Sequence, residues 1–279
     1  FKDVVAVHYA DSMTRLKLQE LSLEEKCKEM AGPKNFVALN MKTLFVFKGM
    51  AITPIGGNSK SGIPSVYFTD GPRGVIVGKD KTGFPVPMAR AATWNVALEQ
   101  EIGMAIADEV REEGAGLIGT PCMNLLRHPA NGRAQEGFGE DPHLVGQMGL
   151  HLMQGIQSRG VMATAKHFAL NSLENSRYTV NVKIDERTLQ EVYLPHFKLC
   201  IDNGVASVMS AYNKVNGQYC GENNHLLNDV LRKQWGFRGF VHSDWEKGVY
   251  STAPSIRAGM NVEMMISKFY KYSVVNKTI

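Results

Sequence analysis

The fold of this 279-residue chain is decided by one stretch, Gly239-Phe240-Val241-His242-Ser243-Asp244-Trp245. Its apolar and β-branched residues predict a short buried strand, and that strand ends at a carboxylate. In α/β barrel enzymes the reactive groups lie at the carboxyl ends of the strands. An isolated Asp in this position more often caps the following helix. Asp244 is therefore a candidate reactive group whose role depends on what surrounds it.

The same unit of strand, polar strand end and helix recurs upstream. Further strands are predicted at residues 66–69, 116–118, 161–165, 206–213 and 260–264. Helical patterns separate them at residues 96–113, 141–160, 185–204 and 226–235. This alternation predicts a parallel sheet. We expect an α/β fold, a (β/α)8 TIM-like barrel that is incomplete or irregular at its N- and C-terminal ends. A doubly wound open sheet is the alternative, although no glycine-rich phosphate-binding turn follows the first strand.

Capping patterns predict where several helices begin. Ser22 and Glu25 have the spacing of a capping box. Asp141 before Pro142 forms an N-cap and first-turn pair, which gives Asp141 a structural role, and Asp185 caps the next helix. Residues 31–64 are predicted to be irregular, with a surface loop at their glycine-rich part.

Composition narrows the classes of function. A net charge of +4 without basic runs gives no reason to expect a nucleic-acid partner. No apolar run approaches the roughly twenty residues that span a bilayer, so we expect no membrane insertion. The four cysteines are widely scattered, which predicts buried free thiols rather than a metal site. The chain begins at Phe1 without a basic-then-apolar leader, so we expect a trimmed or processed chain and assign no compartment.

Polar and aromatic residues gather at or near the predicted strand ends. The set is Asp70, Arg133, Lys166, His167, Met209, Tyr212, Asp244 and Trp245. Sugar hydroxyls both donate and accept hydrogen bonds, and charged partners strengthen those bonds, while aromatic rings cover the C–H faces of a sugar. Taken singly, these residues have ordinary interpretations: a turn for Asp70, core packing for Met209, a half-buried strand position for Tyr212. Together they predict a carbohydrate pocket.

Two carboxylates at such a pocket indicate a mechanism. In a retaining glycosidase one carboxylate attacks the anomeric carbon while a second group protonates the leaving oxygen. We expect Asp244 to be the nucleophile, kept ionised by cations such as Arg133 or Lys166. Asp70, Lys166 and His167 would hold sugar hydroxyls rather than transfer protons.

Ordered motifs extend this interpretation over about residues 21–264. They are Thr-Asp-Gly-Pro-Arg-Gly (69–74), Ala-Ala-Thr-Trp (91–94), Gly-Arg (132–133) followed by Glu136, Gly-Glu-Asp-Pro (139–142), Lys-His-Phe-Ala (166–169), Tyr-Leu-Pro-His-Phe (193–197), Met-Ser-Ala-Tyr-Asn (209–213), and Trp-Gly-Phe (235–237) leading to Ser-Asp-Trp (243–245). In these motifs and their order the chain resembles glycoside hydrolase family 3, the β-glucosidase group.

The resemblance implies one N-terminal catalytic barrel domain over residues 1–279. It implies retaining hydrolysis that releases non-reducing terminal β-D-glucose through a covalent glycosyl–Asp244 intermediate, without a metal or organic cofactor. The substrates would be β-glucosides, oligosaccharides or aryl glycosides. The implied subsite for the terminal sugar is lined by Asp70, Arg133, Lys166, His167, Tyr212 and Trp245, with Met209 nearby.

The chain also departs from the family pattern. In multidomain members the acid/base Glu usually lies in a following α/β sandwich domain. This chain stops soon after Glu263, so we expect that domain to be absent from it. A separate second domain or a homo-oligomer is then a possible partner. Ala-Leu-Asn-Ser at residues 169–172 disfavours the N-acetylglucosaminidase branch, which carries a His there. Glu136 and Glu174 are the in-chain candidates for the acid, although we expect both to pair with arginines such as Arg177. The short segment 264–268 leaves barrel closure open.

Two alternatives remain beside the β-glucosidase. One is a β-xylosidase or broad aryl-β-glycosidase, because Asp70, Lys166 and His167 suit several sugars. The other is a sugar-binding barrel that lacks its acid/base and is catalytically impaired.

Overall fold

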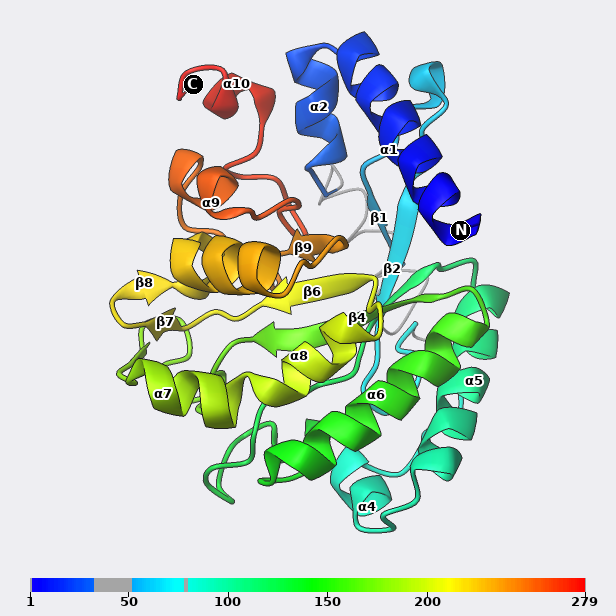
Figure 1. Cartoon of the computed structure of the whole chain (residues 1–279), viewed down its shortest axis with the longest axis vertical. Helices are drawn as coiled ribbons and strands as arrows, with labels where there is room; N and C mark the ends of the chain where they lie inside the picture. The colour runs from blue at the N-terminus through cyan, green and yellow to red at the C-terminus, as the bar shows by residue number, and fades with distance from the viewer. Residues whose placement is uncertain (1, 33–51, 78–79, 279) are drawn as a thin grey trace.

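A curled six-stranded sheet, seen in Figure 1, forms the centre of the computed structural model, which describes residues 2–32, 52–77 and 80–278. The sheet order is β1 (Thr53–Ile55), β2 (Val66–Asp70), β3 (Leu117–Gly119), β4 (Met162–Phe168), β6 (Ser207–Ser210) and β9 (Phe240–His242). All neighbours from β2 to β9 are parallel, whereas β1 runs antiparallel to β2. A second, three-stranded sheet consists of β5 (Asn181–Val182), β7 (Lys214–Val215) and β8 (Gln218–Tyr219).

Helices connect the parallel strands, as the sequence predicts. The α-helices are α1 (Lys2–Glu20), α2 (Leu23–Glu29), α4 (Pro87–Ala91), α5 (Val96–Glu112), α6 (Pro142–Ser158), α7 (Glu186–Thr188), α8 (Pro195–Asp202), α9 (Ala253–Ala258) and α10 (Tyr272–Val275). Two π-helices are η3 (Leu189–Tyr193) and η5 (His225–Gln234), and three single 3₁₀ turns are η1 (Ser59–Ser61), η2 (Ala134–Glu136) and η4 (Cys220–Glu222). Helices α5 and α6 pack side by side (Figure 1). None of the helices in the described part of the chain is long and apolar enough to cross a membrane.

The predicted caps are confirmed. The Ser22 side chain accepts from the Glu25 amide, and the Glu25 carboxylate accepts from the Ser22 amide in return. The Asp141 side chain accepts from the Leu144 amide, with Pro142 in the first turn of α6. Asp185 accepts from Thr188 in the same way. These local patterns are reliable because each cap satisfies amides at a helix start that have no partner within the helix.

The expected (β/α)8 barrel is confirmed only in part. The fold is α/β with a curled parallel sheet, and the strand order never reverses, which argues against a doubly wound sheet. However, β1 is antiparallel to β2, because residues 56–65 between them are fewer than the dozen or so that a parallel crossover needs. A regular eightfold barrel is therefore not shown.

Isolated backbone contacts replace the predicted strand at residues 260–264. Val262 pairs with His242 at the edge of β9, and Glu263 pairs with Ala31. The Gly56 amide then donates to the Ala31 carbonyl oxygen at 3.1 Å, next to β1. Two isolated β-bridges and one backbone hydrogen bond thus connect β9, at one edge of the six-stranded sheet, to the region of β1 at the other edge.

Other differences have local causes. The helix predicted at residues 185–204 is divided into α7, η3 and α8, because Pro195 has no amide to continue the hydrogen bonding. Strand β6 ends at Ser210, short of the predicted residue 213. Helix α1 and strand β1 were not predicted, and residues 33–51 of the predicted irregular segment lie outside the described residues.

The inside of the curled sheet is filled by a small apolar cluster of Ile55, Phe68, Leu117, Met209, Val262 and Met264. The main core lies between the sheet and the surrounding helices. All four cysteines are buried free thiols, which confirms that prediction. The cluster inside the sheet supports the strand ends above it, where the polar residues lie.

Candidate active site

Most of the predicted site residues meet at one edge of the sheet. Asp70 is the last residue of β2, Lys166 and His167 are among the last three residues of β4, and Asp244 follows β9. Tyr212 follows β6, and Arg133 precedes the short turn η2. Because the carboxyl ends of parallel strands share an edge, residues far apart in the sequence are brought together there.

Lys166 forms an ion pair inside this site. Its Nζ lies 2.7 Å from Asp70 Oδ1, and the lysine side chain is 1% exposed. Burial is the largest single influence and opposes the charge, but Asp70, together with Glu136 and Cys122, outweighs it and raises the pKa of the Lys166 ammonium. The Gly71 amide also donates to Asp70 Oδ1, at 2.9 Å, and holds the carboxylate in its turn. The site therefore contains a fixed, buried cation beside a partly exposed carboxylate.

Asp244 is a buried carboxylate with two unlike oxygens. The Trp245 amide donates to Oδ1 at 2.7 Å. Oδ2 accepts no hydrogen bond from the described residues, and it lies 3.7 Å from His167 Nε2. Burial raises the pKa of Asp244 to about 6, against the opposite effects of Arg133, the Trp245 amide and Lys166. Arg133 and Lys166 act in the direction that the sequence led us to expect, although burial has the larger effect and leaves the pKa above its ordinary value.

Arg133 is held by two glutamates. Its Nε and Nη2 donate to Glu136 at 2.9 and 2.6 Å, and its Nη1 lies 3.9 Å from Glu174. Glu174 in turn accepts from Arg177 Nη1 at 2.9 Å. Both in-chain acid candidates are therefore arginine partners, as the sequence led us to expect.

Aromatic rings form one side of the site. The Tyr212 hydroxyl donates to the Trp245 carbonyl oxygen at 2.7 Å and lies against the Asp244 carboxylate. The Tyr212 ring meets the Tyr178 ring edge-on, and the Arg177 guanidinium lies 4.7 Å from the Tyr212 ring centre. The Trp245 ring packs against Phe68. Met209, by contrast, is buried in the apolar cluster inside the sheet, below these rings.

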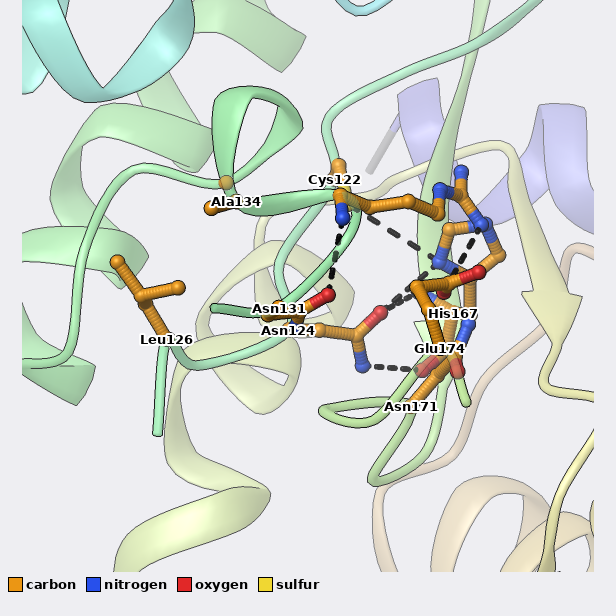
Figure 2. Close-up of a pocket in the computed structure, with 10 residues that line it drawn as sticks. Cys122, Asn124, Leu126, Asn131, Ala134, His167, Asn171 and Glu174 are labelled. Carbon is orange, nitrogen blue, oxygen red and sulfur yellow. Dashed lines mark hydrogen bonds and ion pairs between the residues drawn. The ribbon is translucent and has the colours of Figure 1, made fainter. Parts of the chain in front are cut away.

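A small cavity of about 10 Å³, shown in Figure 2, adjoins the site. Its lining includes His167, Asn124, Asn171 and Glu174 (Figure 2). Asn171 is 4% exposed, and neither atom of its amide has a partner among the described residues. A space of this size holds about one water molecule. The cavity is thus a polar flank of the site rather than a second ligand site.

Several residues of this site were not predicted, namely Asn124, Asn171, Arg177 and Tyr178. Asn124 lies five residues beyond the end of β3, and Asn171, Arg177 and Tyr178 lie in the loop after β4, so neither strand-end position nor helical periodicity selects them. Over the described ranges, no three His, Cys, Asp or Glu side chains are placed to hold a metal ion.

The chain is similar to known proteins over most of its length. Residues 52–279 match the sequence profile of the glycosyl hydrolase family 3 N terminal domain. The β-glucosidase B of Emericella nidulans is 41% identical over 253 residues, which are 88% of this chain and 28% of that protein. The fold of this chain is similar to that of β-glucosidase 3B from Thermotoga neapolitana in complex with glucose. The TM-score is 0.82, with 36% identity over 92% of this chain and 37% of the other. DesR, a β-glucosidase from Streptomyces venezuelae in complex with D-glucose, gives a TM-score of 0.85 and 32% identity over 94% of this chain and 34% of the other. The chain therefore spans between 28% and 37% of the length of these relatives.

Proposed function

The chain belongs to glycosyl hydrolase family 3, and we propose that it carries the nucleophile and the sugar-binding groups of a retaining β-glucosidase. Its substrate would be a β-glucoside, either an oligosaccharide or an aryl glycoside. The reaction would release the non-reducing terminal β-D-glucose. The named relatives are β-glucosidases, and two of them have been solved with glucose. The observation that carries the proposal is Asp244, whose Oδ1 is held by an amide while Oδ2 has no partner among the described residues.

Asp244 suits the first chemical step. Its Oδ2 would attack the anomeric carbon, forming a C–O bond as the bond to the leaving oxygen breaks, and a covalent glucosyl–Asp244 ester results. With a pKa of about 6, most Asp244 carboxylates are ionised at neutral pH. Arg133 and Lys166 favour that ionised form. Water would attack the ester in the second step and release glucose with retained configuration.

The surrounding groups would hold the sugar ring. Asp70 accepts and Lys166 donates hydrogen bonds at the far side of the site, where their ion pair presents both kinds of partner to vicinal hydroxyls. Arg133 and His167 would contact further hydroxyls, and Trp245 with Tyr212 would cover the apolar face. Met209, which lies beneath them, would support the rings by packing.

The protonation of the leaving group needs a different residue. Glu136 and Glu174 accept hydrogen bonds from Arg133 and Arg177, so both carboxyl groups are already occupied by arginine partners. Activated aryl glucosides avoid this requirement, because their phenolates leave without protonation. The proposal is therefore tested best on such substrates.

We expect 2,4-dinitrophenyl β-D-glucoside to give a burst of phenolate and a mass increment of one glucosyl residue on the chain. Asp244→Asn should abolish the burst and the adduct while glucose binding, measured by calorimetry, persists. Asp202→Asn is the matched control, because Asp202 is an exposed partner of Lys198 on α8. A burst from Asp244→Asn equal to that of the control would disprove the nucleophile.

The same assay separates the alternatives. A faster burst with the aryl β-xyloside than with the glucoside would favour a β-xylosidase or a broad aryl-β-glycosidase. Glucose binding without any burst or adduct would favour a sugar-binding barrel that does not turn over.

A further inference from the structure

We propose that Asn124 is a positioning residue that fixes the tautomer of His167, with the proton on Nδ1 and an accepting lone pair on Nε2 directed at the sugar. The inference deepens the proposed function, and its consequence for sugar binding rests on that function. The tautomer itself does not, because it follows from contacts within the protein.

The orientation of the Asn124 amide is determined by the backbone of His167. Asn124 Nδ2 donates to the His167 carbonyl oxygen at 2.8 Å, and Asn124 Oδ1 accepts from the His167 amide at 3.0 Å. The two residues thus form a closed pair of hydrogen bonds, drawn as dashed lines in Figure 2. If the oxygen and nitrogen of this amide were exchanged, Nδ2 would face the His167 amide, donor against donor, and Oδ1 would face the His167 carbonyl oxygen, acceptor against acceptor. Oδ1 must therefore be the atom near the histidine ring.

The backbone around Asn124 is also fixed to β4. The Met123 amide donates to the Lys166 carbonyl oxygen at 2.6 Å, and the Lys166 amide donates to the Pro121 carbonyl oxygen at 3.0 Å. Residues 121–123 therefore pair with the end of β4 beyond β3. Asn124 is held at a set distance from the imidazole rather than on a loose loop.

The position of Oδ1 decides the protonation of the ring. His167 Nδ1 lies 2.9 Å from Asn124 Oδ1, which is an acceptor only, so Nδ1 must carry a proton. The His167 side chain is 2% exposed, and burial, with Arg133 and Lys166 nearby, lowers the pKa of the ring well below the ordinary value. A neutral imidazole protonated on Nδ1 has a lone pair on Nε2.

That lone pair faces a second acceptor. Nε2 lies 3.7 Å from Asp244 Oδ2, so an accepting nitrogen and an accepting oxygen stand opposite each other without a donor between them. A ligand hydroxyl placed there satisfies one of them by donation, and a second hydroxyl satisfies the other. The pair therefore selects polyhydroxylated ligands, and a fluorine in place of the donating hydroxyl would leave Nε2 without a partner.

The tautomer is measured by long-range ¹H–¹⁵N correlation spectra of the full chain labelled with ¹⁵N-histidine, with the His167 signal assigned by its loss in His167→Gln. We expect a pyrrole-type Nδ1 and a pyridine-type Nε2 at neutral pH. Asn124→Asp keeps the oxygen that faces Nδ1, replaces the donating Nδ2 by a second oxygen and adds a negative charge, so it should raise the pH at which His167 becomes doubly protonated. The other charged or titratable groups that act on the ring are Cys122, whose Sγ lies 4.0 Å from Nδ1, and Arg133, Lys166, Arg177, His242 and Asp244, and all are unchanged in this variant.

Two further variants make the result decisive. Asn124→Leu removes the acceptor, so the His167 signal should lose its tautomeric preference. Asn223→Asp is the matched control, because Asn223 is a buried asparagine that also bonds backbone atoms on both sides but lies outside the site. A pyridine-type Nδ1 in the unaltered chain, or an Asn124→Asp titration identical to that of the control, would overturn the proposal.

Binding data distinguish a wrong tautomer assignment for His167 from a wrong proposed function. Monodeoxyfluoro glucosides are compared with the parent glucoside in the unaltered chain and in Asn124→Asp, at a pH where the ¹⁵N spectra show a neutral ring in the unaltered chain and a doubly protonated ring in the variant. Nε2 then accepts in the first and donates in the second. We expect one fluorinated position to lose about tenfold in affinity in the unaltered chain and to lose less in the variant, since the fluorine leaves the buried Nε2 acceptor without a donor. A chain with the expected spectrum that binds no glucoside would contradict the proposed function but not the tautomer.

Discussion

Replacing Asp244 by Asn should stabilise the folded chain at neutral pH, even though it removes the proposed nucleophile. The variant keeps the shape of the side chain and an oxygen for the Trp245 amide, which lies 2.7 Å from Oδ1. Its Nδ2 takes the place of Oδ2 and can donate to His167 Nε2, which lies 3.7 Å from Oδ2. The substitution therefore removes a buried charge without removing a hydrogen bond that the described residues make.

The magnitude follows from the pKa of Asp244. Burial raises that pKa from its ordinary value of 3.8 to about 6 in the folded chain. A difference of about two pKa units, at about 1.4 kcal/mol each, corresponds to about 3 kcal/mol. The sign is destabilising for the native chain, because a raised pKa means that the folded state binds the proton more tightly than the unfolded state. The cost is absent below about pH 4, grows between about pH 4 and 6, and is constant above that.

Urea unfolding followed by tryptophan fluorescence measures this difference. We expect the increase in the free energy of unfolding caused by Asp244→Asn to be larger at pH 8 than at pH 4, by up to about 3 kcal/mol. Asp185→Asn is a control of opposite sign. Asp185 caps a helix and its pKa is lowered by the Thr188 hydrogen bonds, so its carboxylate stabilises the fold at high pH and that stabilisation is lost as the pH falls.

A pH-independent effect of Asp244→Asn would refute this reasoning. It would mean that the folded and unfolded chains ionise this carboxyl group alike, and that desolvation does not dominate its environment. A smaller gain at pH 8 than at pH 4 would show that the cations outweigh burial.

Three further predictions concern the site and its support. The rate of the phenolate burst should fall as the pH drops below about 6, because attack needs the Asp244 carboxylate; a rate that is constant from pH 7 to pH 4.5 would contradict the assignment. Arg90→Met should lower the free energy of unfolding by about 3–5 kcal/mol, since it leaves the buried Glu99 carboxylate unpaired. Adding Glu99→Leu should restore most of the loss. Strictly additive effects of the two substitutions in urea unfolding would exclude coupling between them. Glu263→Leu should cost at least about 1–3 kcal/mol in the same assay, because the Glu263 carboxylate accepts from the amides of residues 268–270, and a cost within error would show that water replaces it.

Some features of the structure depend on few neighbouring residues, and these could be predicted from the sequence. The caps at Ser22, Asp141 and Asp185 need only a side chain and an amide three residues away. The parallel strands could be located because buried strands carry apolar, β-branched residues and end at polar ones. The antiparallel β1 could not, because its direction depends on the length of the connection to β2 and its pairing is non-local.

The candidate site divides in the same way. The sequence by itself determined the order of the motifs, the family they resemble and the residue types at the strand ends, because these are properties of the chain read in one dimension. The tertiary structure alone decided that Lys166 pairs with Asp70, that Asn124 faces the ring of His167, and that one oxygen of Asp244 is held while the other faces that ring. It also decided the pKa of Asp244, because desolvation and nearby charges come from segments that only the curled sheet brings within a few ångströms of each other.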